Sequence, residues 1–171
     1  FILDDFMDDY FNKPIVIALA LIVYGIAFIY IERAHKNVEP KINDFKELDF
    51  MTAIKIGLFQ CLALVPGTSR SGSTILGGLL VGTSRSIATE FSFFMGIPIM
   101  FGASGLKLLK FGFHYSLAEF VILLVGSVVS FVVSLFVIKF LLKYIKHHDF
   151  QAFGWYRIAL GIIVIGSLFF K

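Results

Sequence analysis

Long apolar stretches separated by short polar ones dominate the chain of 171 residues. The apolar stretches are continuous rather than alternating, a pattern typical of membrane-spanning helices and not of an outer-membrane barrel. Because roughly 17 to 25 apolar residues are needed to cross the hydrocarbon core, four stretches are long enough to do so. We predict these spans at residues 15–31, 87–109, 117–142 and 153–170.

A fifth apolar region, residues 50–82, is broken near its centre by Pro66 and Gly67. Proline cannot continue a helix and glycine accepts turn conformations, so each half is too short to span comfortably. We predict a re-entrant helical hairpin whose tip lines a cavity, because irregular backbone at membrane depth is tolerated only there. The expected fold is all-α: one membrane domain over residues 1–171, with four spans and one hairpin, as half of an inverted-repeat architecture.

Composition supports the membrane class, since 58% of the residues are hydrophobic, 21 are Phe and only 16% are charged. The net charge of +3 is modest and no dense basic cluster occurs, which excludes a nucleic-acid partner. The single Cys61 excludes an intrachain disulfide. Four aspartates near the start are interpreted as a solvated interfacial segment rather than a metal site, namely Asp4, Asp5, Asp8 and Asp9.

The break in the hairpin is a polar island, residues 66–74, with the sequence PGTSRSGST. Thr68 or Ser69 is suited to cap the helix that follows, and the free N–H groups of its first turn form an anion site. Arg70 adds a guanidinium that can hold a phosphate through two hydrogen bonds. A polar turn that only satisfies backbone groups is the alternative, and we favour it less because a charge near mid-membrane costs on the order of 3 kcal/mol.

Basic residues also predict the orientation of the chain. The loop that begins at Arg33, the turn at Arg85 and the stretch 139–146 fall on one side if the hairpin returns to the side it entered. By the positive-inside rule that side is cytoplasmic. Both ends of this chain would then lie on the external side.

The island resembles the PGxSRSxxT signature of bacterial undecaprenyl-diphosphate phosphatases, the bacitracin-resistance protein family. Further segments of the chain look like the same family, and the similarity runs through most of the 171 residues: Gly57–Leu64, Gly77–Gly82, Ser84-Arg85, Glu90–Phe93 and Tyr156-Arg157. The chain resembles only the C-terminal portion of such a protein. We therefore expect its natural start to be missing.

The resemblance implies hydrolysis of undecaprenyl diphosphate to undecaprenyl phosphate and inorganic phosphate, which recycles the lipid carrier of peptidoglycan synthesis and affects cell shape and antibiotic resistance. It implies three residue groups: catalytic Arg70, Ser69 and Ser71; substrate-binding Gly67, Thr68, Ser73 and Thr74; and the more distant Gln60, Glu90 and Arg157. Whether a serine or water attacks the phosphorus is left open. Glu90 is either a partner of Arg70 or Arg85 or an interfacial acid, and Arg157 is either an interfacial anchor or a second phosphate contact.

A divalent cation, Mg²⁺ or Ca²⁺, is also implied by the resemblance. The acidic ExxxE motif of the family is absent here, and Gln60 stands where an inverted repeat would place its first glutamate. We therefore expect no metal site in this chain and no activity from it alone. The expected partner is a polyprenyl diphosphate, and the expected location is the bacterial inner membrane, which the chain would cross several times. Whether it forms a homodimer is left open. The alternative function is an inverted-repeat transporter of a lipid or anion, which would show flux without phosphate release.

Overall fold

The computed structural model describes residues 11, 13–36, 38–112 and 116–169. Within these ranges the chain is helical, and its only extended pairing is an isolated parallel bridge between Ile42 and Thr83. The all-α prediction is confirmed. The predicted aspartate segment lies outside the described residues. The helices are α2 Pro14–Ala34, α3 Phe50–Gln60, α4 Arg70–Val81, α5 Arg85–Phe111, α6 Leu117–Ile145 and α7 Gln151–Phe169, with short 3₁₀ turns η1 Phe45–Glu47 and η2 Cys61–Leu64.

Four of these helices are long and apolar enough to cross a membrane, which confirms a polytopic membrane protein. Each begins and ends within about one turn of the corresponding predicted span. The differences arise at polar ends. Ser84 caps α5 by accepting a backbone hydrogen bond, so α5 begins before its first apolar residues, and Ser116 caps α6 in the same way. Helix α2 continues through Glu32 and Arg33, beyond its last predicted residue.

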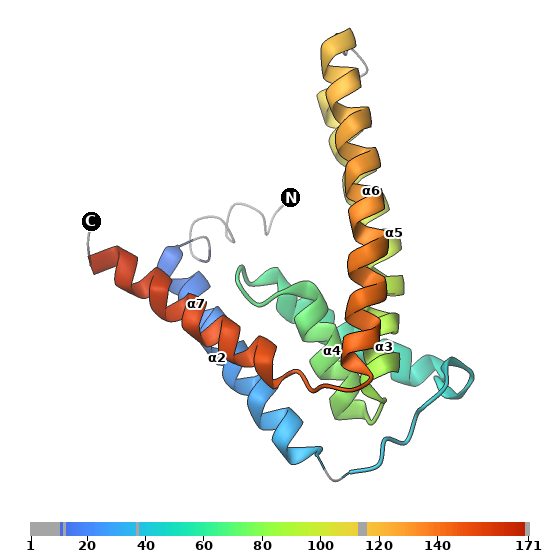
Figure 1. Cartoon of the computed structure of the whole chain (residues 1–171), viewed down its shortest axis with the longest axis vertical. Coiled ribbons are helices and arrows are strands. Elements are labelled where there is room, and N and C mark those ends of the chain that lie inside the picture. Colours follow the sequence, from blue (N-terminus) through green and yellow to red (C-terminus); the bar gives the residue numbers. More distant parts are fainter. Residues whose placement is uncertain (1–10, 12, 37, 113–115, 170–171) are drawn as a thin grey trace.

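Helices α2 and α7 pack closely along much of their length, as Figure 1 shows at the lower left. Glycines permit this approach. A Cβ on Gly25 would lie 2.7 Å from the carbonyl oxygen of Gly154, and one on Gly161 would lie 2.9 Å from that of Ala18. Because small residues let two backbones come together, α2 and α7 form one firm unit beside the hairpin.

The predicted hairpin is formed by α3, η2 and α4. Asp49 caps α3 by accepting a hydrogen bond of 2.8 Å from the N–H of Thr52. The Thr52 side chain, and after it this N–H, hold the pKa of Asp49 below its ordinary value. Helix α4 has 12 residues, so it is about 18 Å long and cannot cross about 30 Å of hydrocarbon. The hairpin returns to its entry side, where the N–H of Lys41 donates to the carbonyl of Gly82.

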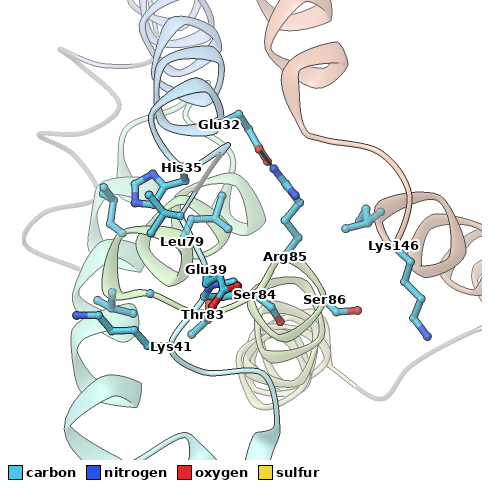
Figure 2. Close-up of a pocket in the computed structure, with 16 residues that line it drawn as sticks. Glu32, His35, Glu39, Lys41, Leu79, Thr83, Ser84, Arg85, Ser86 and Lys146 are labelled. Atoms are coloured by element: carbon cyan, nitrogen blue, oxygen red, sulfur yellow. Dashed lines mark hydrogen bonds and ion pairs between the residues drawn. The ribbon is translucent and has the colours of Figure 1, made fainter.

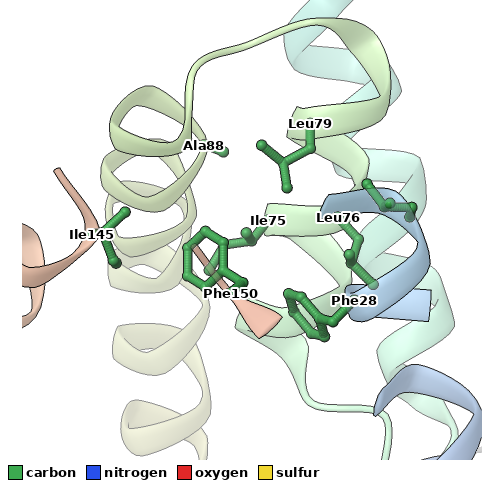
Figure 3. Packing of buried hydrophobic residues seen from close by; sticks show 8 residues of the cluster. Phe28, Ile75, Leu76, Leu79, Ala88, Ile145 and Phe150 are labelled. Carbon is green, nitrogen blue, oxygen red and sulfur yellow. The ribbon is translucent and has the colours of Figure 1, made fainter. Parts of the chain in front are cut away.

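A buried apolar cluster joins the hairpin to the surrounding helices toward the C-terminal end of α4, where the loop before α3 also lies (Figure 3). Because lipid chains are as apolar as these side chains, close packing rather than transfer out of water holds such a cluster together. The cluster therefore fixes α4 against the ends of α2, α5, α6 and α7. Its members are Phe28, Ile31, Ile75, Leu76, Leu79, Ala88, Ile145 and Phe150.

Helices α5 and α6 form a long arm that extends away from the other helices (Figure 1). The apolar side chains of α6 are exposed along almost its entire length, including Phe120, Phe131 and Phe136. Such a surface is compatible with contact to lipid chains, since hydrocarbon is as apolar as the side chains themselves.

Candidate active site

The polar island forms the tip of the hairpin, and its backbone turns through two residues with positive φ. Gly67 has φ 93° and Ser69 has φ 71°. A Cβ on Gly67 would lie 2.7 Å from the carbonyl oxygen of Ile17, so this position accepts only glycine. Thr68 is buried and its hydroxyl donates to the carbonyl of Val65 at 2.8 Å. Because the Thr68 hydroxyl is directed at the preceding turn, Ser69 is the residue that caps α4, and its Oγ accepts a hydrogen bond of 3.2 Å from the N–H of Gly72.

The start of α4 leaves hydrogen-bond donors available. In the part of the chain that the structure describes, no acceptor is found for the N–H groups of Arg70 and Ser71. Ser69 is exposed and Ser71 is partly exposed, and their hydroxyl oxygens lie 3.4 Å apart. Two open hydroxyls beside free N–H groups at a helix N-terminus suit an anion, because the helix dipole adds positive potential there.

Arg70 lies on the same end of α4 and reaches toward α5. Its Nη1 donates to the carbonyl of Ser92 at 3.3 Å, and its guanidinium rests against Gly96 one turn later. A Cβ at Gly96 would lie 2.6 Å from Nη2 of Arg70. The charge has no carboxylate partner, because the single ion pair found among the described residues joins Arg85 and Glu32. Arg70 is therefore positioned by α5 but not neutralised.

Ser73 and Thr74 are predicted substrate ligands, yet both are buried at the tip. The Thr74 and Ser92 hydroxyl oxygens lie 2.6 Å apart, and the Ser73 and Tyr24 hydroxyl oxygens lie 3.3 Å apart. These contacts tie α4 to α5 and α2. Direct substrate contact stays a prediction for both residues, whereas their observed contacts hold the start of α4 in place.

The three more distant candidates, Gln60, Glu90 and Arg157, have different surroundings in the structure. The side-chain oxygen of Gln60 is buried at the end of α3 and has no hydrogen-bond partner among the described residues. Glu90 forms no ion pair with Arg70 or Arg85 within those residues, since Arg85 pairs with Glu32. The interpretation of Glu90 as an interfacial acid is therefore favoured.

Arg157, the third of these candidates, contacts the tip itself. Its Nη2 donates to the carbonyl oxygens of Gly67 at 2.6 Å and Thr68 at 2.9 Å. Its guanidinium carbon lies 5.7 Å from the centre of the Tyr24 ring, a cation–π contact. The sequence alone did not reveal this arrangement.

Sequence reasoning also missed Tyr24, Ser92 and Gly96. Tyr24 and Ser92 place hydroxyl groups in apolar helices, and this is the signal that marks them, because a buried hydroxyl needs a partner. Gly96 carried no such signal. Its role depends on how α5 is rotated against α4, which the sequence pattern does not specify.

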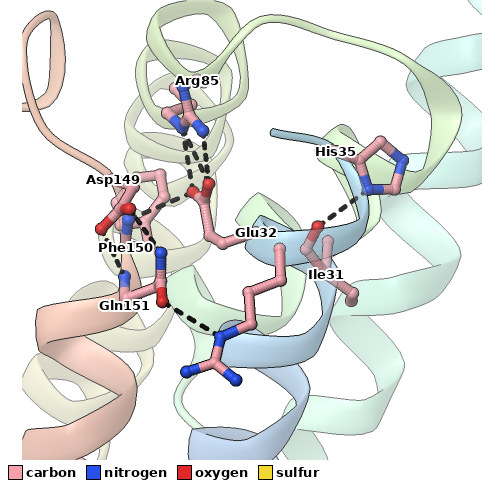
Figure 4. A network of polar contacts seen from close by, with 8 residues as sticks. Ile31, Glu32, His35, Arg85, Asp149, Phe150 and Gln151 are labelled. Atoms are coloured by element: carbon pink, nitrogen blue, oxygen red, sulfur yellow. Dashed lines mark hydrogen bonds and ion pairs between the residues drawn. The ribbon is translucent and has the colours of Figure 1, made fainter. Parts of the chain in front are cut away.

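The opposite end of α4 contains a different polar cluster (Figure 4). Arg85 binds both oxygens of Glu32, which is 2% exposed, and Glu32 also accepts from the N–H of Phe150 at 3.1 Å. A cavity of about 480 Å³ adjoins this cluster, with Lys41 and Lys146 among its lining residues (Figure 2). This cavity is not the predicted site, because none of residues 66–74 lines it. Its arginine also pairs already with a buried carboxylate.

The donor set at the tip does not form a metal site. Across the described ranges no three His, Cys, Asp or Glu side chains lie close enough together to hold an ion. Mg²⁺ and Ca²⁺ prefer carboxylate and carbonyl oxygens, whereas the tip offers a guanidinium, N–H groups and hydroxyls. We derive no step through a metal from these residues.

Four candidate spans and a re-entrant hairpin with a cationic tip define a polytopic membrane protein with a site suited to a phosphate group. The chain belongs to the bacitracin resistance protein BacA family, whose sequence profile matches residues 1–163. The predicted family is confirmed.

Several curated relatives share more than half of their aligned residues with the chain. It is 55% identical to the undecaprenyl-diphosphatase of Enterococcus faecalis strain V583, covering 98% of this chain and 62% of the relative. It is 56% identical to that of Acetivibrio thermocellus, covering 95% and 60%, and 58% identical to undecaprenyl-diphosphatase 1 of Clostridioides difficile, covering 97% and 60%. The chain thus spans about three-fifths of the length of these relatives.

Proposed function

We propose that this chain supplies the phosphate-binding part of an undecaprenyl-diphosphate phosphatase in the bacterial inner membrane. The observation that carries the proposal is Arg70 at the start of α4, a cation with no carboxylate partner among the described residues. The open hydroxyls of Ser69 and Ser71 lie beside it. The names of the relatives support the same substrate.

The proposed reaction breaks the anhydride bond of the lipid diphosphate. An oxygen from water, or from Ser69 or Ser71, attacks the terminal phosphorus, and the bridging oxygen leaves with the lipid as undecaprenyl phosphate. If a serine attacks, water then hydrolyses the phosphoserine, and both routes release inorganic phosphate. Arg70 and the N–H groups of α4 stabilise the negative charge on the transferred group and on the leaving oxygen.

The membrane setting agrees with this substrate. A prenyl chain belongs in hydrocarbon, where the apolar surfaces of α5 and α6 also belong. The diphosphate needs a polar site within reach of the membrane, and the hairpin tip offers one. We place the tip toward the external face, since the basic residues favour a cytoplasmic location for the opposite end.

A divalent cation remains part of the proposal because the family resemblance implies one. The described residues do not form its site, so the prediction is tested by chelation alone. Removing divalent ions should abolish phosphate release, and adding Mg²⁺ or Ca²⁺ should restore it. Full activity in the presence of the chelator would contradict this part of the proposal.

The test of function uses a full-length chimera, in which this chain replaces the matching region of the Enterococcus faecalis relative. Purified in detergent, the chimera should release inorganic phosphate from undecaprenyl diphosphate, with the unaltered relative measured in parallel. A folded chimera that releases none, while the relative does, would overturn the proposal. Lipid flux in vesicles without phosphate release would instead support the transporter alternative.

A further inference from the structure

Arg157 donates to the backbone of the tip itself, whereas Arg70 donates to the backbone of α5. Nη2 of Arg157 donates to two consecutive backbone carbonyls, those of Gly67 and Thr68, at 2.6 and 2.9 Å. Its Nε is buried and has no partner within the described ranges. The contacts of Nη2 are directed at the backbone of the turn rather than at an open surface. This arginine therefore acts on the position of the tip.

The two carbonyls lie at the part of the turn that most needs support. Gly67 and Ser69, the residues on either side of Thr68, both have positive φ, and for a serine this conformation is strained. Such a conformation persists only where surrounding contacts hold it. Hydrogen bonds from a charged donor are stronger than neutral ones, so Arg157 is well suited to hold this turn.

Tyr24 completes the support from α2. Its ring lies beside the Arg157 guanidinium, and its hydroxyl oxygen lies 3.3 Å from that of Ser73, whose hydroxyl donates to the carbonyl of Ser69. Arg157 thus holds the residues before the cap, and Tyr24 holds the cap and first turn. Both residues belong to the α2 and α7 unit that is joined through Gly25 and Gly154.

We propose that Arg157, together with Tyr24, is a positioning residue that holds the Gly67–Ser69 turn in the conformation that aims Ser69, Arg70 and the first N–H groups of α4 at a phosphate. The role rests on the proposed function of the tip. Arg157 does not bind the substrate in this account. Its loss misplaces the catalytic groups, and a displacement of about 1 Å can lower turnover by about 100-fold.

Two measurements on the Enterococcus faecalis chimera separate positioning from binding. Arg157→Ala should lower kcat for phosphate release by about 10- to 100-fold, and Arg157→Lys should restore part of it, because an ammonium can still donate to one carbonyl. The inhibition constant of inorganic pyrophosphate should rise at least tenfold in Arg70→Ala, which loses the cation. It should rise by no more than about threefold in Arg157→Ala, because the misplaced tip still keeps the Arg70 charge near the phosphate. An equal rise in both variants would make Arg157 a ligand and overturn the proposal.

Amide hydrogen exchange supplies a readout that does not depend on activity. Arg157→Ala should speed exchange at least tenfold in residues 65–72 while α5 and α6 remain unchanged, and Tyr24→Phe should produce a smaller increase. Arg33→Ala is the matched control, since Arg33 is exposed and its side chain forms a hydrogen bond only with Gln151 among the described residues. Unchanged exchange at the tip in Arg157→Ala would refute the positioning role even if the chimera were inactive.

Discussion

An arginine lies near each end of α4, Arg70 in its first turn and Arg85 at the start of α5, but the surroundings of the two charges differ. At the loop end, Arg85 binds a buried carboxylate, Glu32, through both oxygens. At the tip, Arg70 contacts a backbone carbonyl, and no described carboxylate neutralises it. The first arrangement is self-contained, whereas the second has the charge and the free donors that an anion requires.

This difference is the basis of our proposal that Arg85 is structural and Arg70 functional. A buried ion pair leaves little charge for a ligand, and removing one partner costs several kcal/mol because the other stays buried alone. A cation without a counterion in an apolar setting is expensive, and under the proposed function the phosphate of the substrate supplies the missing charge. A count of nearby basic residues would place the phosphate site at the loop end. Whether a carboxylate already neutralises the arginine is therefore the better criterion for locating the site.

Removing Arg70 should have the largest effect. We expect Arg70→Ala to lower kcat/KM of the chimera by about 1,000-fold, because the main cation facing the phosphate is lost. Arg70→Lys should lie between, since an ammonium keeps the charge without the planar pair of donors. Phosphate-release kinetics measure both variants, with thermal unfolding to show that they are folded. Near-normal turnover in Arg70→Ala would remove the basis for placing the site at the tip.

Breaking the pair at the other end should affect stability instead. Glu32→Ala should lower the free energy of unfolding by about 3 kcal/mol, because it leaves Arg85 partly buried without its carboxylate and frees the N–H of Phe150. Activity per folded molecule should persist. Unfolding in detergent and kinetics on the same sample test this, and removing Arg85 as well should recover part of the loss. A stable but inactive Glu32→Ala would reverse the assignment of the two ends.

The α2 and α7 unit should be sensitive to a single methyl group. Gly154→Ala places a Cβ 2.7 Å from the carbonyl oxygen of Gly25, so we expect about 2 kcal/mol of destabilisation. Gly166→Ala is the matched control on α7, because nothing lies within 4 Å of its Cβ position. Thermal unfolding compares them. Equal stability of the two variants would show that the helices do not pack as described.

Gly96→Ala should have the smallest effect of the four while testing the site most locally. The new methyl group would push the Arg70 guanidinium aside without removing its charge, since its Cβ would lie 2.6 Å from Nη2. Because the end of a flexible side chain can shift, we expect a loss of about tenfold in kcat/KM with stability little changed. Gly102→Ala on the same helix, with open space around it, should match the parent. Equal kinetics for the two variants would place the guanidinium elsewhere.

The sequence predicted the helical membrane fold and the location of the tip, because continuous apolar stretches and a Pro-Gly break are local signals. It could not predict the contacts between helices. The sequence predicts either an interfacial anchor or a phosphate contact for Arg157, since nothing in its neighbours shows that it reaches Gly67. Glu90 was considered as a partner for Arg85, whereas the partner is Glu32, 53 residues away in sequence. Such pairings depend on how helices are rotated and spaced, which periodicity does not specify.

The central claim is that the phosphate site lies at the uncompensated end of α4. The most direct test is the binding of inorganic pyrophosphate to the chimera by calorimetry, with Arg70→Ala and Arg85→Ala measured side by side on folded protein. We predict that Arg70→Ala weakens binding at least tenfold and that Arg85→Ala changes it less than threefold. Weaker binding in Arg85→Ala with unchanged binding in Arg70→Ala would contradict the account.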